Sequence, residues 1–296
     1  MLVKRVVSIF LLLFIFSLDV NAKVKVTTTI KPLADIFREI GKDKVSVDYV
    51  IPPNISFHIY EYKISDINKV KDADIFVYIG SGEPKVERLA RITKGQIVKI
   101  GSLIPENLLI RTFEIEEHNQ HFDIEHSNEA FHPAVWLDPR LAIIIANSYY
   151  KTLVKLDPKN RDFYYKNYSK FVLKSVNLYI QWKDKFDKLN NKYFISYHYL
   201  YPYLTKAFGL NYIAVIELGH GRKPTIKHIL HISELIRKKK IKYIFASLYF
   251  FNPKYLALLK KEGVKIIYLD PMGVHSKNYF ETMNNLLENI YKGLKK

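Results

Sequence analysis

The chain has 296 residues, 48% hydrophobic and 25% charged, a composition typical of a globular protein with room for two domains. Lys and Arg outnumber Asp and Glu by 46 to 29, yet the basic residues are spread along the chain and the longest basic run is only Lys238-Lys239-Lys240. We therefore interpret the excess charge as a solvated surface and expect no nucleic-acid binding. The chain has no cysteine, which excludes disulfides and thiolate metal ligands.

Residues 1–22 have the pattern of a secretory signal peptide. Lys4 and Arg5 precede an apolar stretch at 9–18, and Ala22 offers a small residue for cleavage. The apolar stretch is shorter than the roughly 20 residues that span a bilayer. We predict export to the periplasm with cleavage near Ala22.

Strand-like and helix-like segments alternate in two halves of the chain. In the first half, strands are expected at 24–30, 45–51, 75–79 and 97–100, with helices at 32–41 and 141–156. In the second half, strands are expected at 193–197, 212–216, 243–246 and 265–269, with helices at 201–208, 225–239, 253–262 and 279–294. This alternation predicts an α/β fold of two lobes with mainly parallel sheets and a ligand cleft between them.

One long rigid helix is predicted to join the two lobes. Asp157 suits its N-cap, and Pro158 suits its first position. Apolar residues then recur three and four positions apart, at Tyr165, Tyr168, Val172, Val176, Tyr179, Trp182 and Phe186. At 1.5 Å per residue, a helix of about 30 residues would be about 45 Å long and could run along both lobes. The expected organisation is an N-terminal metal-binding lobe at 23–156, a connecting helix at 157–189 and a C-terminal lobe at 190–296.

A polar segment interrupts the first half. Residues 114–132 contain four of the ten histidines, His118, His121, His126 and His132, together with several carboxylates. A long loop of this kind is usually either functional or disordered. Its density of imidazoles and carboxylates favours weak, exchangeable metal capture, and a solvated polar insertion is the alternative.

Residues able to bind a metal follow predicted strands in both halves. His58 follows the second strand, His198 follows the first strand of the second half, and Asp270 follows the last strand. His132 lies between the late strands of the first half and the next helix. Ligands of open parallel sheets bind outside the carboxyl ends of the strands, so these four side chains form our predicted metal site. Imidazole and carboxylate donors without thiols suit Zn²⁺ better than Mn²⁺, which prefers more oxygen.

Around these residues the sequence resembles the metal-specific solute-binding proteins of zinc and manganese ABC importers. The shared segments are a Pro-rich turn leading to His58, Tyr60 and Glu61, a Trp-Leu-Asp-Pro run at 136–139, His198, and Leu-Asp-Pro-Met-Gly at 269–273. The resemblance covers almost the whole chain after the signal sequence. It implies a monomer that delivers a divalent metal ion to the permease of an ABC importer in the membrane, with no enzymatic activity and no catalytic cofactor.

The sequence departs from this family at one ligand position. The family's second ligand histidine falls on Ala134, which cannot bind a metal. His132 lies two residues earlier and would face the same side of an extended segment, so we expect it to substitute. A water molecule or a residue of the 114–132 segment are the alternatives. Glu217 is interpreted as part of a solvated turn that includes residues 220 and 222.

Three rival functions stay open. A secreted zinc hydrolase is disfavoured because the chain has neither a His-Glu-x-x-His nor a Gly-x-Ser-x-Gly motif. A binding protein of similar build for an iron chelate or another ligand is compatible with the 22 tyrosines and with Ala134. A degenerate copy with weak metal binding is the third.

Overall fold

The computed structural model describes residues 23–111, 131–217 and 223–295. The predicted signal peptide and nearly all of the 114–132 segment lie outside these residues, so both remain predictions. Within the described ranges, no helix has the length and apolar character needed to cross a membrane.

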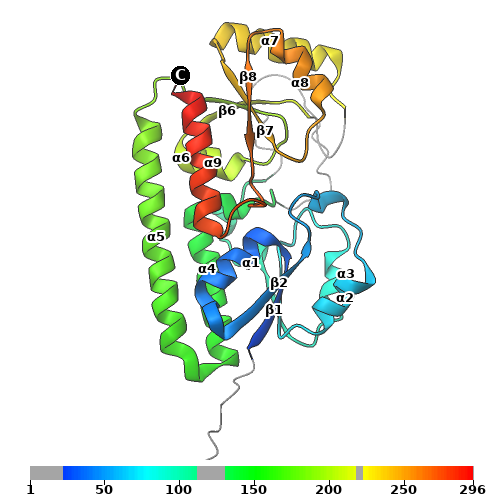
Figure 1. Cartoon of the computed structure of the whole chain (residues 1–296), viewed down its shortest axis with the longest axis vertical. Helices are drawn as coiled ribbons and strands as arrows, with labels where there is room; N and C mark the ends of the chain where they lie inside the picture. The colour runs from blue at the N-terminus through cyan, green and yellow to red at the C-terminus, as the bar shows by residue number, and fades with distance from the viewer. Residues whose placement is uncertain (1–22, 112–130, 218–222, 296) are drawn as a thin grey trace, which may run out of the picture.

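The N-terminal lobe is built on a parallel sheet with the strand order β2-β1-β3-β4. Its strands are β1 (Val24–Ile30), β2 (Val45–Ile51), β3 (Ile75–Tyr78) and β4 (Gln96–Lys99). Its helices are α1 (Lys31–Gly41), α2 (Ile64–Lys71), α3 (Val86–Ala90) and α4 (Pro139–Leu156). α1 packs against α4, whereas α2 and α3 pack against each other on the other side of the lobe (Figure 1).

The C-terminal lobe repeats this topology with the strand order β6-β5-β7-β8, again parallel. Its strands are β5 (Tyr193–Ser196), β6 (Asn211–Val215), β7 (Tyr243–Ser247) and β8 (Lys265–Leu269). Its helices are α6 (Pro202–Phe208), α7 (Ile226–Lys239), α8 (Pro253–Lys260) and α9 (Tyr279–Leu294). Side chains alternate across the sheet, so that Phe194 and Phe245 join the core shared with α9, while Ile195 and Ile244 join the core under α7 and α8.

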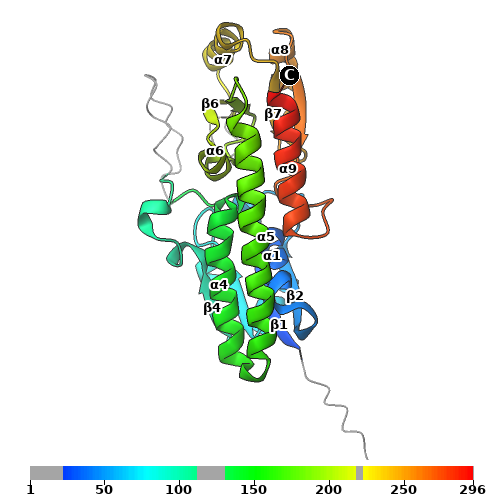
Figure 2. The same cartoon turned by 90° about the vertical axis from the view of Figure 1, so that its left-hand side faces the viewer.

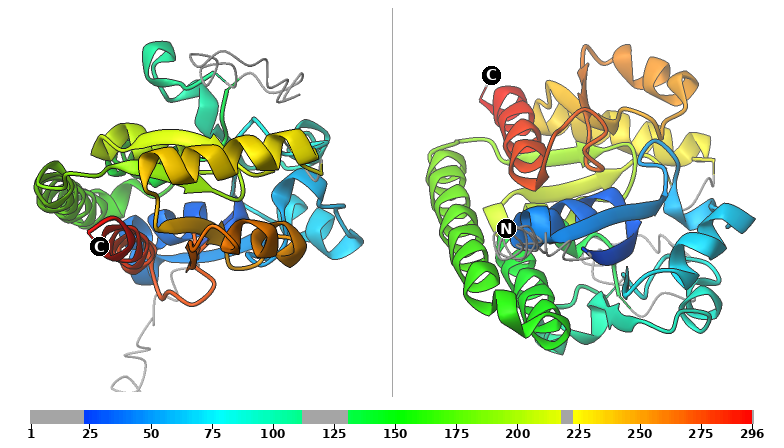
Figure 3. Two further views of the ribbon diagram at one scale, coloured as in Figure 1. Left: turned by 90° about the horizontal axis from the view of Figure 1, so that it is seen from above. Right: turned by 60° about the horizontal axis from the view of Figure 1, so that its bottom comes forward.

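Helix α5 (Arg161–Asp187) runs along both lobes, with α4 beside its first half and α9 beside its second half (Figures 2 and 3). A 3-10 turn at Pro158–Asn160 precedes it. Its 27 residues give a length of about 40 Å. The predicted fold class, two α/β lobes joined by one long helix, is confirmed.

The buried face of α5 differs in part from the run of apolar residues that predicted the helix. The buried positions are Tyr164, Asn167, Phe171, Ser175, Leu178, Trp182 and Phe186. Tyr165 and Val176, which belong to the apolar pattern, are 57% and 39% exposed. The buried stripe includes two polar residues that an apolar pattern passes over: Asn167 donates to the carbonyl of Ile40 at 3.1 Å, and Ser175 is small enough for a fully buried position.

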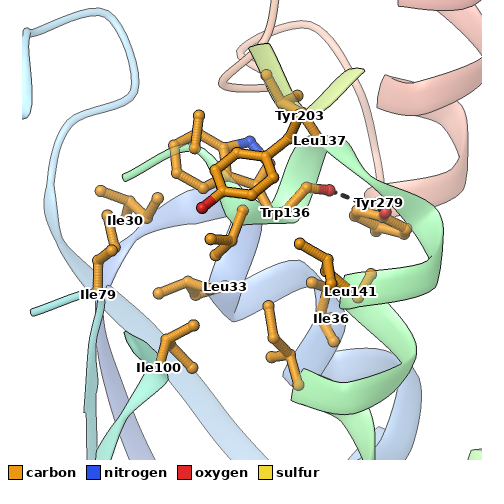
Figure 4. Packing of buried hydrophobic residues seen from close by; sticks show 14 of the residues in the cluster. Ile30, Leu33, Ile36, Ile79, Ile100, Trp136, Leu137, Leu141, Tyr203 and Tyr279 are labelled. Carbon is orange, nitrogen blue, oxygen red and sulfur yellow. Dashed lines mark hydrogen bonds between the residues drawn. The ribbon is translucent and has the colours of Figure 1, made fainter. Parts of the chain in front are cut away.

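Trp136 joins the two lobes. Its side chain is fully buried, and its indole Nε1–H donates to the carbonyl oxygen of Pro271 at 3.3 Å. The Trp136 carbonyl in turn accepts from the hydroxyl of Tyr279 at 2.9 Å, at the start of α9 (Figure 4). A second bridge links Lys31 of α1 to the carbonyl of Ser276 at 3.0 Å. The turn after β8 is therefore fixed against the N-terminal lobe.

Candidate metal site

His58 lies on a 3-10 turn (Phe57–Ile59) in the loop that follows β2. Its ring lies against the ring of buried Phe57, with the centroids 4.1 Å apart. Further along the loop, the hydroxyl of Tyr60 donates to Asp66 Oδ2 at 2.9 Å, which fastens this segment to the first turn of α2. His58 thus comes from a loop that is anchored on both sides of its short turn.

His198 follows β5 and is held more extensively. Its carbonyl oxygen accepts hydrogen bonds from the hydroxyls of Ser196 and Tyr212, at 2.7 and 3.3 Å. Beyond the end of the sheet, the backbone N–H of Glu217 donates to the carbonyl of Tyr197 at 2.8 Å, so the β5–β6 pairing continues to this point. Glu217 Oε2 then lies 2.5 Å from His198 Nδ1.

The two histidines face one cavity between the lobes. Their ring centroids are 6.3 Å apart, and the cavity has a volume of about 340 Å³. The remaining lining residues are mostly aromatic or polar: Ser56, Ile59, Tyr197, Glu217, Lys223, Pro224, Phe250, Phe251, Asn252 and Tyr255. The structure therefore brings together one predicted ligand from each lobe.

The interpretation of Glu217 as part of a solvated turn was wrong. The side chains of Glu217 and His198 are only 14% and 12% exposed, and both line the cavity. The sequence places Glu217 just beyond a predicted strand, but only the sheet order shows that this strand lies beside β5, so that the two strands end side by side. Residues 220 and 222, which shared that interpretation, lie outside the described residues.

His132 occupies a different position. Its side chain is 1% exposed and lies edge-on against the ring of Tyr199, with the centroids 4.9 Å apart. The N–H of Ala134 approaches His132 Nδ1 at 3.3 Å, and Nε2 lies 3.3 Å from the carbonyl oxygen of Tyr199. Both ring nitrogens therefore contact the backbone, and His132 is not among the residues that line the cavity.

Asp270 lies in the turn after β8. Its Oδ2 accepts the backbone N–H of His275 at 2.9 Å, while its buried Oδ1 has no hydrogen-bond partner within the described part of the chain. Burial and, secondarily, the charge of Asp270 raise the pKa of Tyr201 well above the usual range for tyrosine. The turn requires glycine at Gly273, where φ is +68° and a Cβ would lie 2.4 Å from Thr282 Oγ1. Asp270, like His132, is absent from the residues that line the cavity.

No three His, Asp or Glu side chains in ranges 23–111, 131–217 and 223–295 lie close enough to hold a metal ion together. The predicted set of His58, His132, His198 and Asp270 therefore stays a prediction, with His58 and His198 already facing each other. His228 is a packing residue, because its buried Nε2 lies 2.7 Å from the carbonyl of Val215.

A two-lobed α/β binding protein with its candidate site between the lobes is the class that this architecture defines. A model of the family described as "Zinc-uptake complex component A periplasmic" matches residues 26–293. The chain belongs to this family of solute-binding components of zinc uptake.

Individual relatives are similar along most of their length. The chain is 29% identical over 227 residues to the high-affinity zinc uptake system protein ZnuA of Bacillus subtilis (strain 168), covering 75% of this chain and 70% of that protein. It is 25% identical over 284 residues to a protein of Treponema pallidum (strain Nichols) described as metal-binding, covering 93% and 88%. A crystal structure of ZnuA has the same fold, with a TM-score of 0.80, 22% identity and coverage of 92% of this chain and 99% of that one.

Proposed function

We propose that this chain captures Zn²⁺ outside the cytoplasm and delivers it to the permease of an ABC importer. The observation that carries the proposal is that His58 of the N-terminal lobe and His198 of the C-terminal lobe face one cavity, with ring centroids 6.3 Å apart. Two imidazoles in a chain without cysteine suit Zn²⁺ better than Mn²⁺. Membership of a zinc-uptake family supports the same cargo.

The rest of the coordination shell comes from Asp270 and His132 in this proposal. The buried Oδ1 of Asp270, which has no hydrogen-bond partner within the described residues, is an oxygen donor suited to a cation. His132 would have to exchange its contact with the Tyr199 carbonyl for the ion. Neither residue performs chemistry; each binds the ion until the permease accepts it.

The cellular setting of the proposal follows from the predicted signal peptide and from the family. Removal of residues 1–22 near Ala22 would release a monomer into the periplasm, where the two lobes dock on the permease. The His- and acid-rich segment at 114–132 would meet the ion first and pass it to the cavity. The described contacts between the lobes, above all those of Trp136, support delivery with little movement of one lobe relative to the other.

The experiment is a competitive zinc titration of residues 23–296 with a chromophoric chelator. The wild type is compared with a His58→Ala/His198→Ala double variant and with His231→Ala as the control, because His231 lies on α7 and does not line the cavity. We expect near-equimolar, tight zinc binding that the double variant loses and the control keeps. If the wild type binds zinc no more tightly than the double variant, zinc capture is wrong and the chain is a degenerate copy or binds another ligand.

The cavity itself favours a second candidate, a metal that arrives bound to a small organic chelator. A volume of about 340 Å³ with Tyr197, Phe250 and Phe251 among its walls is larger than one ion requires. Lys223 could neutralise a carboxylate of the chelator. Titration with an iron chelate and with a zinc chelate, each beside the bare ion, separates the two candidates. Tighter binding of a chelate that survives in the His58→Ala/His198→Ala variant would favour the second.

A further inference from the structure

We propose that Glu217 is the positioning residue of His198: its carboxylate accepts the Nδ1–H of the imidazole and so directs the lone pair of Nε2 into the cavity. This inference rests on the zinc-binding function proposed above and adds a residue to that site. It concerns the carboxylate–imidazole pair at the carboxyl ends of β5 and β6.

The contact is short and its two partners are fixed independently. Glu217 Oε2 lies 2.5 Å from His198 Nδ1, and both side chains are largely buried. The backbone of Glu217 is held by its N–H to the carbonyl of Tyr197, at 2.8 Å. The backbone of His198 is held at its carbonyl by the hydroxyls of Ser196 and Tyr212. Neither partner needs to reorder for the pair to form.

The chemistry of the pair decides which ring nitrogen remains available for a metal. A neutral imidazole carries one N–H, and an ionised carboxylate can only accept a hydrogen bond. Beside Glu217, the proton of neutral His198 therefore belongs on Nδ1, which leaves Nε2 unprotonated on the other side of the ring. Histidine ligands of zinc characteristically donate their second N–H to a carboxylate or carbonyl, which fixes the tautomer and makes the ligand more basic. Loss of such a partner typically lowers metal affinity by about 10–100-fold.

Direct coordination of the metal by Glu217, in place of the histidine lost at position 134, is the competing role. The orientation of Oε2 towards Nδ1 disfavours this role. The two roles predict different behaviour for a glutamine at position 217. A glutamine amide oxygen can still accept from Nδ1–H, but it is a poorer zinc ligand than a carboxylate.

The experiment measures zinc affinity of residues 23–296 for Glu217→Ala, Glu217→Gln and Glu234→Ala, the last an exposed glutamate on α7 that serves as the control. We expect a loss of about 10–100-fold for alanine, a loss of no more than a few-fold for glutamine, and no change for the control. Equal large losses for alanine and glutamine would overturn the positioning role in favour of direct coordination. Unchanged affinity in the alanine variant would overturn both roles.

A second readout does not depend on zinc. In the metal-free protein at pH 8, ¹⁵N–¹H NMR of labelled histidine distinguishes the two neutral tautomers, and the His198 signal is identified by its absence in His198→Ala. We expect the Nδ1–H tautomer in the wild type and in Glu217→Gln, and a shift towards Nε2–H in Glu217→Ala. A wild-type His198 in the Nε2–H form would overturn the inference. If the wild type fails to bind zinc while His198 shows the Nδ1–H tautomer, the cargo is wrong and the positioning contact stands.

Discussion

The two edges of the site, one from each lobe, hold their histidines in different ways. In the C-terminal lobe, hydrogen bonds fix His198 at the backbone through Ser196 and Tyr212 and at the ring through Glu217. In the N-terminal lobe, His58 lies on a single 3-10 turn with its ring against Phe57. Directional polar contacts fix the first histidine, and packing of its ring against Phe57 contributes to the position of the second.

The two lobes therefore position their histidines differently, although their sheets have the same topology. Both sheets have the same strand order, so the topology alone would give equivalent ligand positions. The polar contacts around His198 preorganise the C-terminal edge of the site, because a ligand held before binding loses less entropy when the metal arrives. The N-terminal edge supplies its histidine on a loop whose position depends on its packing against the core.

Replacing Trp136, which joins the two lobes, should give the largest effect, a loss of stability. Trp136→Ala removes a fully buried indole and its hydrogen bond to Pro271, so we expect a loss of about 3–5 kcal/mol in the free energy of unfolding. Tyr279→Phe, which removes only the hydroxyl bond to the Trp136 carbonyl, should cost about 1 kcal/mol. Urea denaturation followed by circular dichroism measures both. If Trp136→Ala lowers the free energy of unfolding by less than about 1 kcal/mol, the two lobes are not joined through this residue.

The two histidines provide the direct test of the comparison. We expect His58→Ala and His198→Ala each to weaken zinc binding by more than the roughly 100-fold that loss of an outer partner costs, with the larger loss for His198→Ala. The reason is that His198 is the ligand already fixed in its binding orientation. Competitive titration of both single variants beside His231→Ala gives the ratio of their zinc affinities. Equal losses would remove the proposed asymmetry between the edges.

The stability of the N-terminal lobe should also depend on pH. Burial raises the pKa of Glu83 to about 7, although its Oε2 accepts the N–H groups of Ile79 and Gly80 at the end of β3. Because the folded pKa lies above the ordinary value of 4.5, the folded state holds this proton more tightly than the unfolded chain does. The resulting contribution to stability is fully present below about pH 4.5 and is lost as the pH rises to about 7.

Glu83→Gln tests this dependence, since the amide oxygen can accept the same two N–H groups and does not ionise. Relative to the wild type, the variant should gain stability on the order of 2 kcal/mol between pH 4.5 and pH 8. Urea denaturation at four pH values across that window measures the difference, with Glu61→Gln as the exposed control on the same lobe. Parallel pH profiles for wild type and variant would contradict the prediction.

The smallest effect concerns the packing beneath His58. Phe57→Leu keeps an apolar side chain at this buried position but removes the ring that lies against the imidazole. We expect a loss of roughly 1 kcal/mol in stability and a few-fold loss in zinc affinity, because the turn would be less well fixed. Thermal unfolding and zinc titration of the same preparation check both. A zinc affinity as low as that of His58→Ala would mean that Phe57 decides the position of the ligand outright.

The sequence predicted the strands of both lobes, and their helices other than α2 and α3, to within a few residues, because their patterns are local. Pro and Gly mark the ends of α1, and Thr225 caps α7 by accepting the N–H of His228. The apolar pattern alone did not indicate the buried face of α5, where Asn167 is buried against the carbonyl of Ile40 and Ser175 is also buried. A period in the apolar residues identifies a helix, but it does not show which polar residues the tertiary structure buries.

The sequence by itself determined the two-lobed α/β architecture, the long joining helix and the positions of His58 and His198 after their strands, since each depends on residues near one another in the chain. Tertiary structure alone decided that Glu217 lies against His198, that both nitrogens of His132 contact the backbone, and that Trp136 holds the turn after β8. Apart from the contact between the Ala134 N–H and His132 Nδ1, these contacts join residues from different segments of the chain. Such pairings depend on how sheets and loops pack in space, and local sequence patterns carry no record of them.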